Sequence, residues 1–192
     1  MRLFFAVVPD DVVRSGMFTV AALLRRDPQL CHAPIAWVSE DRLHVTLAFL
    51  GEVKAAGVSD VIEVASRPLQ HGPAHVELVS AGVFPPRGNA RVVWLGPSRT
   101  SSLTLIRLHH ALWARLHVHG WRSQPKRYSP HVTIGRVRRG EHVVGLRKVV
   151  ATVPLSSVAW TARRVTLFES RLSGTGVSYR VLAQVPLTTG VR

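Results

Sequence analysis

The sequence predicts a mixed domain of the α+β or α/β class, made of two similar lobes. Three observations indicate this. Short apolar segments with alternating side chains are separated by segments of helical character. The order of strand, helix and strand occurs twice along the chain. In each copy the closing strand begins with His-Val-Thr, at residues 44–46 and 131–133.

The first half alternates strands and helices from its beginning. It is predicted to contain a strand over residues 2–8, a helix from Asp10 to about residue 26, a strand over 43–50 and a helix over about 55–67. Asp10 is a suitable N-cap, because its carboxylate accepts hydrogen bonds from the free N–H groups of the first turn. Pro68 marks the end of the second helix.

The rest of the chain adds a strand, repeats this order over residues 90–137 and ends in a hairpin. The expected elements are strands over residues 75–84 and 90–95, a helix over 101 to about 117, a strand over 130–137, a short helix over 141–149, and strands over 165–171 and 179–185. The last two strands flank Gly174-Thr175-Gly176, which is typical of a hairpin turn.

The spacing of the repeat indicates an internal duplication. The two His-Val-Thr motifs are 87 residues apart (131 minus 44), and the strands that lead each copy are about 88 apart. We therefore expect residues 1–192 to form one two-lobed domain, with lobes related by a pseudo-twofold axis and a cleft between them.

The charge balance indicates an anionic partner. The chain carries 25 Lys and Arg against 11 Asp and Glu, for a formal net charge of +14. Such an excess attracts polyanions, of which nucleic acid is the usual one. Because 22 of the basic residues are arginine, a bias in genome composition is the alternative explanation.

Other features of the composition exclude several classes of protein. A single cysteine, Cys31, excludes an internal disulfide framework and fits a reducing compartment. The apolar run at 3–8 is too short for a signal peptide, and no stretch reaches the ~18 apolar residues of a membrane helix. Only Glu141 and Glu169 follow Glu77, whereas two-metal phosphodiesterases need clustered carboxylates. We therefore expect a cytoplasmic protein with no membrane, metal or cofactor.

The two motifs place polar side chains on one face of each strand. Because strand side chains alternate, the predicted outward-facing residues are His44, Thr46 and Ala48 in the first copy and His131 and Thr133 in the second. A pseudo-twofold axis would bring two imidazoles and two hydroxyls around one small anion. This set suits phosphate-ester chemistry without a metal: one imidazole accepts a proton from water and the other protonates the leaving oxygen.

The two copies differ five residues after each histidine, where Phe49 aligns with Arg136. Arg136 follows the histidine on the same strand and is expected to bind phosphate. Phe49 either offers an aromatic surface to a ligand or packs in the core. Residues 122–148 contain eight Lys and Arg and one acidic residue, which suits the path of a nucleic-acid backbone.

On these residues the sequence resembles the two-histidine phosphoesterases, specifically the bacterial and archaeal RNA 2′,3′-cyclic phosphodiesterases, also called 2′-5′ RNA ligases. The resemblance covers nearly the whole chain. It rests on the two motifs and on segments 2–6, 37–51, 91–96, 130–136 and 167–172.

The resemblance implies a bilobal α+β fold with antiparallel sheets around a central cleft and helices outside. It implies opening of a terminal 2′,3′-cyclic phosphate on RNA to leave a 2′-phosphate. His44 would be the general acid that protonates the 3′-oxygen and His131 the general base that activates water, although pseudo-symmetry allows the reverse. Thr46, Thr133 and Arg136 would bind the phosphate.

Phe49, Arg127, Tyr128 and Arg138 are further expected contacts to RNA. Tyr128-Ser129 departs from the family, in which a phenylalanine and a basic residue are frequent before the second motif. Two other interpretations remain open: the same groups acting on 2′-5′ oligonucleotides or small cyclic nucleotides, and a basic RNA-binding module without turnover. We expect a monomer, because one chain completes the cleft.

Overall fold

The computed structural model describes residues 1–122, 127–174 and 176–189, which form four α-helices and a ten-stranded sheet. In chain order the elements are β1 (Arg2–Val7), α1 (Asp11–Arg26), β2 (Ile35–Trp37), the 3₁₀ helix η1 (Glu40–Arg42), β3 (Val45–Glu52), α2 (Ala55–Ser66), β4 (Leu69–Gln70), β5 (Ala74–Phe84), β6 (Val92–Pro97), α3 (Arg99–Val118), β7 (Val132–Val137), α4 (Leu146–Thr152), β8 (Val158–Ala162), β9 (Arg164–Ser173) and β10 (Gly176–Thr188). This confirms the α+β class.

The sheet has a narrow junction at its middle. The strand order is β4-β10-β9-β1-β3-β7-β6-β5-β8, with β2 also paired to β7. Every described pair is antiparallel except the short parallel pair of β4 with β10. Among the described residues, β3 and β7 are joined through one residue pair, Val45 with Val132. These two valines directly follow His44 and His131, so both motifs begin at the junction.

The two parts of the sheet have matching strand orders on either side of this junction. Three strands run β9-β1-β3 on one side and β5-β6-β7 on the other. Strand β5 belongs to the first half of the sequence and β9 to the second, so each part contains a strand from the opposite half. We retain the internal duplication and the single two-lobed domain as a proposal, which this matching order supports.

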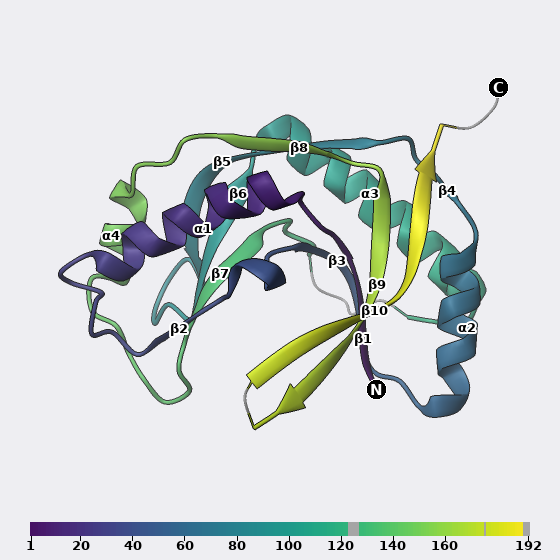
Figure 1. The fold of residues 1–192 in the computed structure, drawn as a ribbon, viewed down its shortest axis with the longest axis horizontal. Coiled ribbons are helices and arrows are strands. Elements are labelled where there is room, and N and C mark those ends of the chain that lie inside the picture. The colour runs from purple at the N-terminus through teal and green to yellow at the C-terminus, as the bar shows by residue number, and fades with distance from the viewer. Residues whose placement is uncertain (123–126, 175, 190–192) are drawn as a thin grey trace.

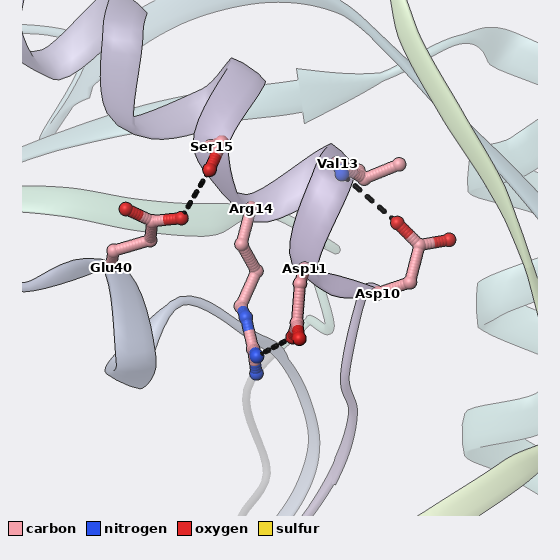
Figure 2. A network of polar contacts seen from close by, with 6 residues as sticks. All are labelled: Asp10, Asp11, Val13, Arg14, Ser15 and Glu40. Atoms are coloured by element: carbon pink, nitrogen blue, oxygen red, sulfur yellow. Dashed lines mark hydrogen bonds and ion pairs between the residues drawn. The ribbon is translucent and has the colours of Figure 1, made fainter.

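Helices cover the sheet from outside, as predicted. In Figure 1, α1 and α4 lie at one end of the molecule and α2 at the other, while the far end of the β9–β10 hairpin projects away from the rest. Helix α1 buries Met17, Val20, Ala21 and Leu24, which recur every three or four residues and so share one face. Its N-terminus is capped by Asp10, whose carboxylate accepts a hydrogen bond from the N–H of Val13 at 2.9 Å (Figure 2).

Some local predictions were wrong or incomplete. The helix predicted over 141–149 begins at Leu146, because Gly145 adopts a left-handed conformation with φ of 76° that a helix cannot contain. Strands β2, β4 and β8 were not predicted. They are short, between two and five residues, and such segments carry too few side chains to show alternation.

Candidate active site

A cleft of about 500 Å³ lies where the two parts of the sheet meet. Its lining includes both members of each motif pair, His44, Thr46, His131 and Thr133, together with Arg136. The structure therefore brings together the five residues that the sequence singled out most strongly. They come from β3 and β7 and from the residue before each strand.

A matching β-bulge follows each motif and decides which later side chains reach the cleft. In the pairing of β1 with β3, Phe5 is opposite Ala48 and Ala6 is opposite Thr46, so Leu47 is the extra residue. In the pairing of β6 with β7, the register shifts in the same way around Ile134. The alternation of side chains between the two faces of each strand therefore shifts by one residue after the motif.

This shift corrects one prediction and explains two others. Ala48 is 2% exposed and packs in the core, although strict alternation placed it on the outer face with the histidine. The residues five positions after each histidine, Phe49 and Arg136, face the cleft instead. Phe49 is accordingly 41% exposed, and the guanidinium of Arg2 lies 5.5 Å from the centre of its ring.

The first histidine is held by the residues around it in a defined tautomer. His44 Nδ1 lies 2.7 Å from the carbonyl oxygen of Arg42, which only accepts hydrogen bonds, so Nδ1 carries the proton. Its other ring nitrogen, Nε2, is 3.1 Å from the hydroxyl oxygen of Thr46. The rings of Phe4 and Tyr179 have centres 5.0 and 5.4 Å from the imidazole. The reactive nitrogen of His44 is therefore Nε2.

The second histidine repeats this arrangement. His131 Nδ1 donates to the carbonyl oxygen of Ser129 at 2.8 Å, again two residues before the histidine. The edge of the Phe84 ring contacts the imidazole, with centres 5.0 Å apart. In both motifs the backbone thus holds Nδ1–H, so Nε2 is the nitrogen that can exchange a proton. In His44 this nitrogen accepts a hydrogen bond from the Thr46 hydroxyl.

Burial keeps both imidazoles neutral in the free protein. Loss of solvent lowers the pKa of His44 from 6.5 to about 4, partly offset by its hydrogen bond to Arg42, and the positive charge of Arg136 adds to the lowering. Burial likewise lowers the pKa of His131, with a further contribution from Arg136. The guanidinium of Arg136 therefore acts electrostatically on both histidines.

Tyr128 links the two motifs through the protein interior. Its hydroxyl donates to the carbonyl oxygen of Thr46 at 3.0 Å, and its ring stacks on that of His109 from α3, with centres 4.0 Å apart. Burial raises the pKa of this hydroxyl. His109 Nδ1 donates in turn to the carbonyl oxygen of Leu47 at 2.6 Å. Two side chains thus hold consecutive carbonyl groups of β3.

The other expected RNA contacts lie in different places. Arg127 and Tyr128 line a hollow of about 410 Å³ that meets the cleft at Thr46, Phe49 and His131. It also includes Phe84 and Trp113, and we name it the Tyr128 hollow. The hydroxyl of Tyr128 already bonds Thr46, so only its ring faces this space. Arg138 is exposed beyond the end of β7 and does not line the cleft. Its expected contact with RNA stays a prediction.

Sequence reasoning missed several residues of the cleft. Arg2, Phe4, Arg42, Ser170 and Tyr179 all contribute to its lining. Three of them belong to segments 2–6 and 167–172, which carry the resemblance to the family but no residue of predicted catalytic role. Arg42 and Tyr179 carried no local signal, because the pairing of β10 with β9 and the position of η1 place them there.

Two further features concern metal binding and membranes. Within the described residues, no three His, Cys, Asp or Glu side chains come close enough to hold a metal ion together. None of their helices has both the length and the apolar character needed to cross a bilayer.

Comparison with known proteins relates this chain to a family. Residues 20–174 match the model of the 2′-5′ RNA ligase superfamily. A curated relative from Thermotoga maritima, named RNA 2′,3′-cyclic phosphodiesterase, is 30% identical over 193 residues that span the whole chain and 98% of the relative. A relative of the same name from Archaeoglobus fulgidus is 34% identical over 139 residues, covering 72% of this chain and 74% of its own. The crystal structure of E. coli LigT complexed with 3′-AMP matches 98% of each chain with a TM-score of 0.71 and 26% identity.

Proposed function

We propose, since the chain belongs to the 2′-5′ RNA ligase superfamily, that it hydrolyses the terminal 2′,3′-cyclic phosphate of RNA to a 2′-phosphate. The observation that carries this proposal is the pair of imidazoles in one cleft, each with Nδ1–H bonded to a backbone carbonyl. Two oriented Nε2 atoms are what the reaction requires, because one must accept a proton from water and the other must donate a proton to the leaving oxygen.

The reaction divides between the two histidines. His131 Nε2 accepts a proton from water, and the water oxygen forms a bond to phosphorus on the side opposite the 3′-oxygen. The bond from phosphorus to the 3′-oxygen breaks, and protonated His44 Nε2 supplies the proton that this oxygen needs. The product is a 2′-phosphate with a free 3′-hydroxyl. His44 has given one proton to the 3′-oxygen, and His131 has gained one proton from water. Exchange with solvent restores both residues.

Three further groups act on the phosphate. The hydroxyls of Thr46 and Thr133 donate hydrogen bonds to its nonbridging oxygens, and the guanidinium of Arg136 balances the negative charge that develops on them. Because these donors are fixed on strands, they need little rearrangement during the reaction. No step in this scheme calls for a metal ion.

Substrate binding also prepares His44 for its role as acid. In the free protein burial lowers the pKa of His44 to about 4, so a protonated imidazole is scarce at neutral pH. A bound cyclic phosphate places a negative charge beside Nε2, which favours the protonated form and raises the pKa. The substrate therefore supplies part of the charge balance that the acid needs.

The test uses a short RNA that ends in a 2′,3′-cyclic phosphate, incubated with the protein in EDTA. The expected product carries a 2′-phosphate. His44→Gln and His131→Gln should each lower kcat by at least about 100-fold, the usual contribution of a general acid or base. His142→Gln, at an exposed position outside the cleft, is the matched control.

Three outcomes would overturn the proposal. They are a 3′-phosphate product, activity that disappears in EDTA and returns with a divalent metal, and near wild-type turnover in either single variant. Circular dichroism of each variant separates a lost catalytic group from a lost fold.

A further inference from the structure

A second hollow, of about 590 Å³, adjoins the cleft on the side of His44. It lies between the start of α1, the helix η1 and strands β8, β9 and β10. It shares Arg42 and Tyr179 with the catalytic cleft, so the two spaces meet at these residues. We name it the Arg163 hollow after an arginine in its wall.

The charge of the Arg163 hollow suits a polyanion. Its lining includes the four arginines Arg14, Arg42, Arg163 and Arg164 and the two aspartates Asp10 and Asp41. Arg14 pairs with Asp11, and Arg164 donates to the side-chain oxygen of Gln184 at 2.9 Å. The guanidinium of Arg163 is exposed and has no hydrogen-bond or ion-pair partner among the described residues.

Arg42 stands at the boundary between the two spaces. Its Nε donates to the hydroxyl of Ser39 at 2.7 Å, and Nη1 donates to the carbonyl oxygen of Val177 at 2.9 Å. These bonds span from η1 to the β9–β10 hairpin and leave Nη2 without a partner within the described part of the chain. Because Arg42 lines both spaces, a phosphate that passes from the cleft into the hollow would pass its guanidinium.

The wall that carries Arg42 is held in place. Figure 2 shows Glu40 of η1 accepting a hydrogen bond from Ser15 of α1, while Asp10 caps the same helix. The N-terminal part of α1 and η1 therefore form one connected wall. Such a wall presents its cations without first having to be ordered by a ligand.

The chemistry of the cleft decides which side the RNA chain occupies. In the proposed reaction water attacks phosphorus from the His131 side, and the 3′-oxygen leaves toward His44. The terminal ribose carries that oxygen, so it lies on the His44 side. The preceding nucleotide is attached through the 5′-oxygen of the same ribose. On this side the cleft is bordered by Tyr179, whose ring centre is 5.4 Å from that of His44 and which also lines the Arg163 hollow.

We propose that the RNA chain leaves the catalytic cleft through the Arg163 hollow, with Arg42 and Arg163 binding the phosphates of the nucleotides that precede the cyclic end. This inference rests on the proposed function. The Tyr128 hollow, which meets the cleft at His131, remains open for the attacking water. Substrates with upstream phosphates therefore gain contacts that a single nucleotide does not.

The experiment compares two substrates. One is cytidine 2′,3′-cyclic phosphate, and the other is a trinucleotide that ends in the same cyclic nucleotide. Arg163→Ala should lower kcat/KM for the trinucleotide about fivefold and leave the mononucleotide unchanged. The slope of log kcat/KM against log salt should become shallower by about 0.7 for the trinucleotide alone, because one phosphate contact is lost.

Two further variants make the test specific. Arg107→Ala, on the exposed side of α3 and outside all three spaces, removes the same charge and should behave as wild type on both substrates. Arg127→Ala removes a charge from the Tyr128 hollow. A selective loss on the trinucleotide in Arg127→Ala, or no selective loss in Arg163→Ala while wild type is active, would overturn the inference. Wild-type inactivity on both substrates would overturn the proposed function and this inference with it.

Discussion

Acid should destabilise the folded chain through His44, and His44→Gln should remove this part of the acid sensitivity. Burial lowers the pKa of His44 in the folded protein from 6.5 to about 4. Between these two values the unfolded chain binds a proton that the folded chain does not. The free energy of unfolding therefore falls as the pH falls through this window. The contribution of His44 to stability is fully present above about pH 6.5.

The size of the effect follows from the two pKa values. Each unit of pKa difference corresponds to about 1.36 kcal/mol. With a pKa of about 4 in the folded state and 6.5 in the unfolded state, lowering the pH from 7.5 to 4.5 removes about 2.5 kcal/mol of stability. That is a large part of the 5–15 kcal/mol that typically separates the folded and unfolded states of a domain.

Urea unfolding of wild type and His44→Gln at pH 7.5 and pH 4.5 measures this contribution. Carboxylates also titrate near pH 4.5, but they do so in both proteins and cancel in the difference. The variant should gain about 2.5 kcal/mol relative to wild type on acidification. His131→Gln should change in the same direction, because burial lowers the pKa of His131 as well. A difference between wild type and His44→Gln that stays constant with pH would refute the reasoning.

Two further predictions concern catalysis. The kcat/KM for a nucleoside 2′,3′-cyclic phosphate should peak below pH 6.5. Burial lowers the pKa of both His44 and His131 in the free protein, and turnover needs one of the two protonated. A pH profile with its maximum above pH 7 would contradict this. Tyr128→Phe should cost about 1 kcal/mol in urea unfolding and lower kcat more than it changes KM, because it leaves the carbonyl of Thr46 without its donor and loosens β3. Unchanged stability and kcat in this variant would show that the bond does not position the motif.

Local patterns were sufficient to predict the parts of the site that depend on one strand. Alternation after His44 and His131 correctly placed each histidine and threonine on one face, because those residues precede the bulge. Ala48 was misplaced because a bulge changes the alternation without changing the composition of the strand. The sequence alone does not mark Leu47 as the extra residue.

Features that depend on pairing between distant segments were beyond local prediction. Strand β8 has only five residues, Val158–Ala162, and it is defined by its pairing with β5. Tyr179 reaches the cleft because β10 pairs with β9, which pairs with β1. The bond from Tyr128 to Thr46 joins residues 82 positions apart. Such contacts follow from the assembled sheet and from no single segment.

The two histidines have equivalent bonds but unequal surroundings, and this inequality bears on their proposed roles. Phe4 and Tyr179 both pack against His44, whereas Phe84 contacts His131, and burial has its larger effect on the pKa of His44. Considered in the free protein alone, the more strongly neutral His44 would suit a base. A cyclic phosphate changes this balance, because its negative charge favours a protonated imidazole most where solvent is least available to screen it. In the proposed mechanism His44 therefore becomes an acid only with phosphate bound, which couples proton donation to the presence of the substrate.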